Sequence, residues 1–123
     1  MYRITKEFHF SASHQLMGLR DGHPCAQLHG HNYIVEVELS SETLDPVGFV
    51  RDYRDLGELK TYIDDEIDHR HLNDVVGDNA VSTEQIAKHF YDWCVARWPE
   101  VSAVRVSETP KTWAEYRPSR TAA

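Results

Sequence analysis

Two segments near the start of the chain alternate between apolar and polar residues, and this pattern limits the possible folds most. In segment 4–12 the apolar side chains occupy even positions, and in segment 33–39 they occupy odd positions, although Ile34 interrupts the polar face. A period of two is typical of strands that bury one face. A loop with Gly18 and Pro24 separates the two segments. The sequence therefore predicts two strands, each with one apolar face.

The rest of the chain contains two helical patterns followed by two further strand patterns. Apolar side chains recur at helical spacing over residues 56–67, and a second helix is expected over residues 82–97. Strands are expected at 101–108 and around 113–116. The order β-β-α-α-β-β predicts an α+β fold, a four-stranded antiparallel sheet with two helices on one face. The length suits one domain spanning residues 1–123.

Charge and hydropathy exclude several classes of partner. The formal net charge is −7 and no cluster of Lys and Arg is present, whereas nucleic-acid binding needs a basic face. A small anionic substrate is compatible with this charge, because a pocket can be locally positive. The sequence has no run of about 18 apolar residues, so no membrane span or membrane partner is expected. No signal peptide is recognisable at the start, which predicts a cytoplasmic location.

Three of the eight histidines form a predicted metal site. His29 and His31 flank Gly30, and side chains at i and i+2 of a strand point to the same side. His14 extends the apolar face of the first strand, and His31 begins the apolar face of the second. If the two strands pair antiparallel, all three imidazoles converge at one end of the sheet. Three neutral imidazoles with an open fourth position are typical of catalytic zinc. The alternative is an incidental polar turn.

Cys25 lies four residues before His29, in the loop near the predicted metal. A thiol beside a dication or a protonated histidine has a lowered pKa and becomes a usable base or nucleophile. Equally, Cys25 is a candidate fourth ligand of a closed structural zinc site. The other cysteine, Cys94, falls inside the apolar second helix and is expected in the core.

The adjacent pair Asp68 and His69, and separately Glu108, are candidates for proton transfer or recognition. Asp68 precedes His69 after the first helix, and an Asp beside a His can orient and charge it. The alternatives are a histidine favoured by the helix dipole, or a role for His71 instead. Glu108 extends the apolar face of the third strand, where a carboxylate needs a partner. A heterocycle with a ring N–H beside an amino group would supply two parallel hydrogen bonds. The alternative is a solvated side chain.

Several short motifs, in this order and at these intervals, resemble the 6-pyruvoyltetrahydropterin synthase family over residues 8–108. The closer resemblance is to its bacterial branch, the 6-carboxy-5,6,7,8-tetrahydropterin synthases. The motifs are Phe10-Ser11-Ala12-Ser13-His14, Cys25-Ala26-Gln27-Leu28-His29-Gly30-His31-Asn32-Tyr33, Val50-Arg51-Asp52-Tyr53-Arg54-Asp55-Leu56, Ile67-Asp68-His69-Arg70-His71-Leu72-Asn73-Asp74, Ser82-Thr83-Glu84 and Ser107-Glu108-Thr109.

The resemblance implies a cofactor and catalytic roles. It implies that the three histidines bind Zn²⁺, and that Cys25 is the catalytic thiol, working with Asp68 and His69. The implied enzyme is a zinc-dependent lyase that converts 7,8-dihydroneopterin triphosphate to 6-carboxytetrahydropterin, acetaldehyde and triphosphate. Its product would feed the synthesis of 7-deazapurines such as queuosine.

The resemblance also implies how the substrate is held and how subunits assemble. It makes Glu108 the residue that grips the pterin ring, with a part in proton relay in some descriptions of the family. Ser82 and Thr83 fall where the family contacts the pterin. The implied architecture is the tunnelling fold, in which three subunits close a barrel and two trimers stack into a hexamer. Active sites would then lie between subunits.

The assignment to the carboxy-forming branch depends on the spacing of three residues between Cys25 and His29, because the animal pyruvoyl-forming enzymes usually carry a longer insert there. The sequence departs from the family pattern at residues 110–113 and at Val81, where proline is common. Two alternatives stay open. One is a 6-pyruvoyltetrahydropterin synthase, which eliminates triphosphate without carbon–carbon cleavage. The other is a non-catalytic binding module stabilised by zinc. Candidate triphosphate-binding cations are Lys111, Arg117 and Arg51.

Overall fold

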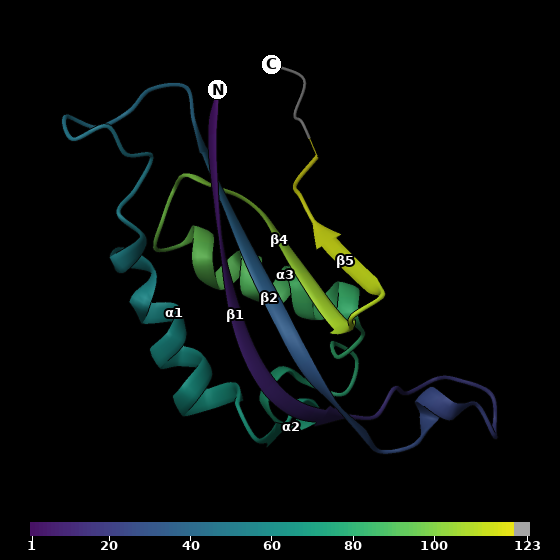
Figure 1. Ribbon diagram of the computed structural model, residues 1–123. Coiled ribbons are helices and arrows are strands. Elements are labelled where there is room, and N and C mark those ends of the chain that lie inside the picture. The colour runs from purple at the N-terminus through teal and green to yellow at the C-terminus, as the bar shows by residue number, and fades with distance from the viewer. Residues whose placement is uncertain (120–123) are drawn as a thin grey trace.

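The computed structural model of the protein describes residues 1–119, so residues 120–123 of the expected domain lie outside the described residues. A five-stranded sheet forms its centre, in the spatial order β3-β1-β2-β4-β5 (Figure 1). All neighbouring strands are antiparallel except β3, which runs parallel to β1. The strands are β1 (Tyr2–His14), β2 (His29–Ser41), β3 (Arg70–His71), β4 (Val101–Thr109) and β5 (Thr112–Tyr116).

The main helices pack against one face of this sheet, which confirms the predicted α+β class. Figure 1 shows α1 beside β1 and α3 crossing behind the central strands. Among the described residues, no helix has the length and apolar character needed to cross a bilayer. The helical elements are η1 (Pro24–Ala26), η2 (Tyr53–Leu56), α1 (Gly57–Tyr62), η3 (Ile63–Ile67), α2 (Leu72–Val76) and α3 (Thr83–Val95).

The first predicted helix, residues 56–67, is one continuous coil of changing pitch. It passes from the 3₁₀ turn η2 through α1 into the π-helical turn η3. The predicted apolar stripe is confirmed, because its four side chains are buried against the sheet: Leu56, Leu59, Ile63 and Ile67. The second predicted helix is shorter than expected, since α3 ends at Val95 rather than at Arg97.

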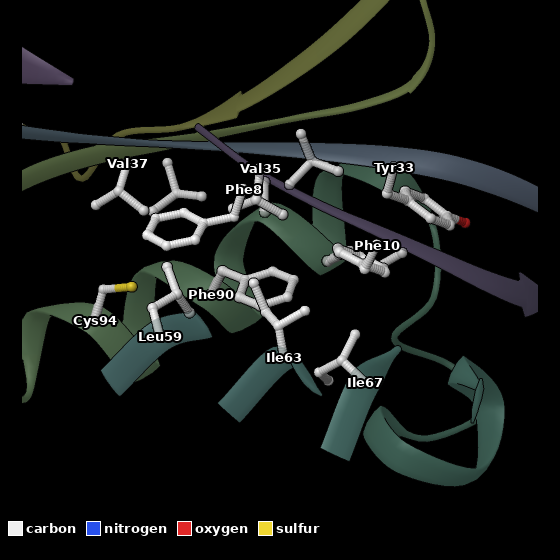
Figure 2. Packing of buried hydrophobic residues seen from close by; sticks show 14 of the residues in the cluster. Phe8, Phe10, Tyr33, Val35, Val37, Leu59, Ile63, Ile67, Phe90 and Cys94 are labelled. Atoms are coloured by element: carbon white, nitrogen blue, oxygen red, sulfur yellow. The ribbon is translucent and has the colours of Figure 1, made fainter. Parts of the chain in front are cut away.

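The long hairpin of β1 and β2 places the two predicted apolar faces on the same side. Phe8 pairs with Val35 and Phe10 with Tyr33, so even positions of β1 face odd positions of β2. These side chains pack onto α1, η3 and α3 (Figure 2). The ring of Phe10 stacks on that of Tyr33 at 4.9 Å between centroids. The alternation in the sequence therefore defines the core.

The prediction of four strands and two helices was wrong in the connection after residue 67, which contains β3 and α2. Strand β3 has two residues, too few to show a period of two. It forms because residues 70–71 pair alongside Ala12 and Ser13 of β1. Helix α2 is anchored by Asn73, whose side-chain amide exchanges two hydrogen bonds with the backbone of Gln15 at 2.8 and 2.9 Å.

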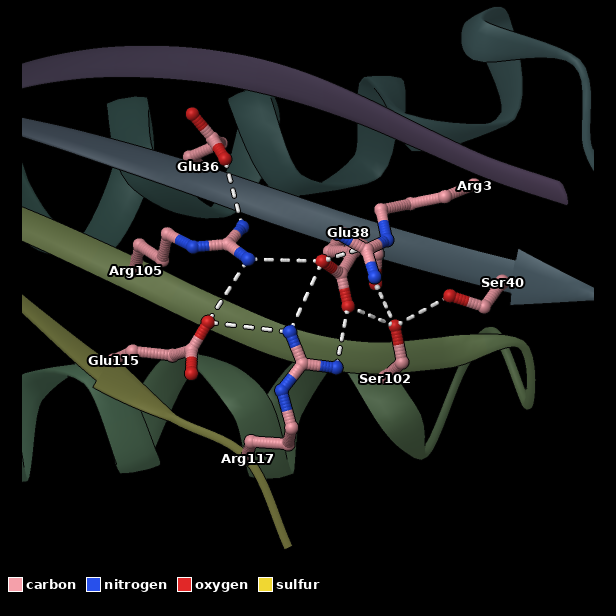
Figure 3. A network of polar contacts seen from close by, with 8 residues as sticks. All are labelled: Arg3, Glu36, Glu38, Ser40, Ser102, Arg105, Glu115 and Arg117. Atoms are coloured by element: carbon pink, nitrogen blue, oxygen red, sulfur yellow. Dashed lines mark hydrogen bonds and ion pairs between the residues drawn. The ribbon is translucent and has the colours of Figure 1, made fainter. Parts of the chain in front are cut away.

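The opposite face of the sheet carries a network of charged side chains around Glu38, a fully buried residue (Figure 3). Arg105 and Arg117 contact the Glu38 carboxylate at 2.9 and 2.8 Å, and Arg3 lies 3.3 Å from it. Burial alone would raise the pKa of Glu38, but hydrogen bonds from Arg117, Ser102 and Arg105 outweigh it and lower the pKa to about 2. The buried charge is therefore balanced by its neighbours.

Candidate metal centre and active site

The three predicted metal-binding histidines converge where β1 ends and β2 begins. His14 and His29 are direct partners in the strand register, and His31 lies opposite Ala12. One ring nitrogen of each histidine lies within 4.8 Å of the other two. The shortest separation joins the Nε2 atoms of His14 and His29, at 2.9 Å. The strand register thus assembles the cluster that residue parity predicted.

The hydrogen bonds of these rings fit a bound cation. The Nδ1 of His14 donates to the backbone carbonyl of Val81, and the Nδ1 of His29 donates to that of Gln27, both at 2.7 Å. A carbonyl only accepts, so each neutral ring presents a lone pair at Nε2. Two such lone pairs 2.9 Å apart repel each other unless a positive charge lies between them. Carbonyl-oriented imidazoles of this kind are usual around protein-bound metals.

His31 supplies a third observation that favours a metal. Its Nε2 atom is buried and has no hydrogen-bond partner among the described residues. Burial lowers the pKa of His14 and of His31, so both rings favour the neutral form that binds metals. The cluster therefore brings three imidazole nitrogens to one place, two of them on rings that burial favours in the neutral form, which suits Zn²⁺.

Glu108, at the end of β4, brings a carboxylate to the same cluster. Its Oε2 atom lies 3.6 Å from Nε2 of His31 and 3.7 Å from Nε2 of His14. Its side chain is 28% exposed, so it borders both the cluster and solvent. The carboxylate faces the histidines. This position places it beside any ligand bound at the cluster, and its negative charge offsets that of a dication.

Asp68 and His69 touch each other and are held against β1. The Oδ2 of Asp68 lies 2.9 Å from Nδ1 of His69. The backbone of Ser11 holds both residues: its N–H donates to Asp68 at 2.8 Å, and its carbonyl accepts from the His69 N–H at 2.6 Å. The hydrogen bond from Ser11 is the main reason that the pKa of Asp68 is lowered. The backbone of His69 has φ of 59°, a conformation that residues other than glycine rarely adopt.

The imidazole of His69 borders an open cleft of about 630 Å³, which His31 also lines. His71 lies in the same cleft, where its Nδ1 is 3.0 Å from the hydroxyl of Ser13. Asp68 is therefore paired with His69, whereas His71 contacts Ser13. A cleft of this size matches the space that a small-molecule ligand occupies, about 300–1,000 Å³.

Cys25 lies in η1, inside the loop between β1 and β2, and is partly buried. Backbone hydrogen bonds fix this turn: the Leu16 N–H donates to the Cys25 carbonyl at 3.0 Å, and the Cys25 N–H donates to Nδ1 of His23 at 3.1 Å. Within residues 1–119, the group of close potential metal ligands contains the three histidines and not the Cys25 thiol. This arrangement leaves the thiol outside the cluster.

Ser82 and Thr83 lie at the start of α3, next to the carbonyl that orients His14. Ser82 is the N-cap of the helix, and its hydroxyl forms a capping box with Gln85. Val81, the residue before it, supplies the carbonyl for His14. The start of α3 is therefore joined directly to the histidine cluster, a link that the sequence did not reveal.

Two of the three candidate triphosphate-binding cations are already paired. Arg51 forms a bidentate ion pair with Glu100 at 3.0 Å and contacts Asp55 at 3.1 Å. Arg117 belongs to the network around Glu38. Both arginines have carboxylate partners that an incoming phosphate would have to displace.

Comparison with known proteins places this geometry in a family. The family model described as 6-pyruvoyl tetrahydropterin synthase matches residues 3–119. The 6-carboxy-5,6,7,8-tetrahydropterin synthase of Bacillus subtilis is 31% identical, over 97% of this chain and 87% of its own. That of Synechocystis sp. is 33% identical, over 94% and 93%. The structure of Caenorhabditis elegans 6-pyruvoyl tetrahydropterin synthase superposes with a TM-score of 0.83 at 27% identity, over 96% of both chains. The chain belongs to the 6-pyruvoyl tetrahydropterin synthase family.

Proposed function

We propose that this protein is a zinc-dependent 6-carboxy-5,6,7,8-tetrahydropterin synthase. The substrate would be 7,8-dihydroneopterin triphosphate, and the products 6-carboxytetrahydropterin, acetaldehyde and triphosphate. The observation that carries the proposal is the cluster of His14, His29 and His31, with lone pairs facing one another and Glu108 beside them. The names of the Bacillus subtilis and Synechocystis relatives support the carboxy-forming reaction.

The three histidines would hold Zn²⁺, which supplies Lewis-acid polarisation of oxygen atoms on the substrate side chain. Glu108 would accept hydrogen bonds from the ring N–H and amino group of the pterin, because its carboxylate lies at the mouth of the cluster. Ser82 and Thr83 are proposed as further pterin contacts. Held in this way, the side chain of the substrate would be positioned for proton transfer.

Asp68, His69 and Cys25 would move the protons. Asp68 orients the His69 ring through Nδ1, which leaves Nε2 of His69 as the atom that exchanges a proton with substrate. Cys25 would act as the partner acid or base. In the trimeric assembly proposed below, the complete site would draw residues from more than one subunit.

The proposed assembly is a trimeric barrel, with two trimers forming a hexamer. Strand β5 pairs only with β4 among the described strands, and β1 is covered on its outer side only at residues 12–13. Exposed strand edges of this kind favour pairing between chains. The assembly state can be measured by light scattering. The cytoplasmic location and the use of the product in 7-deazapurine or queuosine synthesis stay predictions.

The direct test is mass spectrometry of the products formed from 7,8-dihydroneopterin triphosphate, with and without a zinc chelator. The proposal expects 6-carboxytetrahydropterin and acetaldehyde, and expects their loss on chelation. A pyruvoyl product would favour the second candidate, a 6-pyruvoyltetrahydropterin synthase, which the similarity to the Caenorhabditis elegans structure supports. Turnover that persists after complete removal of zinc would overturn the role of the metal.

The Cys25→Ala variant distinguishes the proposed enzyme from the third candidate, a zinc-stabilised binding module. In the proposed enzyme this variant keeps one zinc per subunit and its unfolding temperature, while turnover falls by about 10²–10⁴-fold, the usual loss for a general acid or base. A structural site with Cys25 as the fourth ligand would instead lose zinc and stability. Cys94→Ala is a control for loss of a thiol, because that side chain is buried in the core.

A further inference from the structure

Tyr33 carries a hydroxyl group that is buried in the fold. The residue is fully buried, and its hydroxyl has no hydrogen-bond partner among the described residues. The only other such side-chain atom there is Nε2 of His31, two positions earlier on the same face of β2. A buried hydroxyl without a partner is costly, and its place in a native protein calls for an explanation.

The position of Tyr33 directs this hydroxyl to the histidine cluster. Its ring stacks on Phe10 and meets the rings of His31 and His14 edge-on, at 5.5 and 6.0 Å between centroids. Figure 2 shows the hydroxyl oxygen at the border of the apolar cluster, on the side where β1 ends. A phenol is protonated at neutral pH, so this hydroxyl can donate a hydrogen bond.

We propose that Tyr33 is a positioning residue whose hydroxyl donates a hydrogen bond to an oxygen atom on the side chain of the pterin bound at the histidine cluster. This inference rests on the proposed function, since it assumes a hydroxylated pterin as ligand. A bound Zn²⁺ would account for the unpartnered nitrogen of His31. A hydrogen bond to the pterin side chain would account for the unpartnered hydroxyl of Tyr33.

Two other roles for Tyr33 explain its buried hydroxyl less well. A purely structural role would be served better by phenylalanine, which fills the same space against Phe10 without a buried polar atom. Direct ligation of the metal by the phenol would make Tyr33 a fourth protein ligand and close the site. A closed site would not accept substrate oxygen.

The test compares Tyr33→Phe with the natural protein, both loaded with zinc, for binding of two probes by fluorescence titration. Neopterin carries a hydroxylated side chain, and pterin has the same ring with hydrogen in its place. We expect the variant to bind neopterin about tenfold more weakly, the loss of one hydrogen bond, and pterin within about twofold of the natural protein. Zinc content should be unchanged, and the ligand-free variant should unfold at the same temperature or higher.

The control is Tyr62→Phe, which removes a half-buried hydroxyl that bonds His89 at 2.7 Å on the helical layer. It should leave both affinities unchanged. Equal weakening of neopterin and pterin by Tyr33→Phe, or no weakening of either, would overturn the inference. Loss of zinc from Tyr33→Phe would also overturn it, because Tyr33 would then be a metal ligand. If the natural protein binds neither probe, the proposed function is contradicted, and the role of Tyr33 that depends on it is contradicted as well.

Discussion

Replacing Glu38 by glutamine tests whether the buried charge network on the open face of the sheet stabilises the fold. The pKa of Glu38 falls from an ordinary value of 4.5 to about 2 in the folded protein. A difference of about 2.5 between the two pKa values corresponds to about 3 kcal/mol of folding free energy at pH 7. Because the folded pKa is the lower one, this contribution is complete well above pH 4.5 and is lost as the pH falls towards 2. At pH 3 about 1.4 kcal/mol should remain.

The assay is urea unfolding of the natural protein and of Glu38→Gln at pH 7 and pH 3, with EDTA present throughout so that metal loss does not differ between samples. The variant should be less stable by about 3 kcal/mol at pH 7, and the difference should shrink by more than half at pH 3. Glu36→Gln is the matched control, because Glu36 shares Arg105 but is partly exposed. It should cost about 1 kcal/mol or less at either pH. A Glu38→Gln cost that stays constant with pH would refute the reasoning.

Substitutions at three further positions test other parts of the molecule. His31→Ala should reduce bound zinc from one atom per chain to almost none by mass spectrometry of the metal, with the circular dichroism spectrum retained; full occupancy would contradict the metal site. His69→Gly and His69→Ala should both lower turnover by about 10²-fold or more. The free energy of unfolding of the glycine variant should exceed that of the alanine variant by about 1 kcal/mol, because φ of 59° suits glycine. Equal stability in urea would argue against backbone strain. Phe10→Ala should lower the free energy of unfolding by about 3–5 kcal/mol, since Phe10 packs between Tyr33 and Phe90; a loss below about 1.5 kcal/mol would show that the core can rearrange around it.

The successful prediction that the three histidines converge depended mainly on which side chains share a face of each strand. A period of two in β1 and β2 determines which side chains share a face, and antiparallel pairing then brings His14 to His29. Only the direction of pairing had to be assumed. The convergence of the three histidines could therefore be predicted from local rules together with one assumption about topology.

Other parts of the site depend on contacts between distant segments, which leave no local pattern. The bond from His14 to Val81 joins residues 67 positions apart, and the one from Ser11 to Asp68 spans 57. Strand β3 forms through such contacts and has too few residues to show a period. The alternation in the sequence predicts that the Tyr33 ring is buried. It does not predict whether the Tyr33 hydroxyl has a hydrogen-bond partner. Parity could place Glu108 on a face but could not set its distance from the histidines.

The 13-residue register between β1 and β2 also limits how the gene can change. Deleting a single codon between Phe8 and His14 would turn His14 to the opposite face of the sheet, or else turn the aromatic side chains out of the core. A two-codon change would preserve the alternation but shift the pairing. The loop over residues 15–28 lies outside that ladder, so its length is free of this constraint. We therefore expect relatives to differ in length within this loop and to conserve the number of residues between the strand aromatics and the histidines.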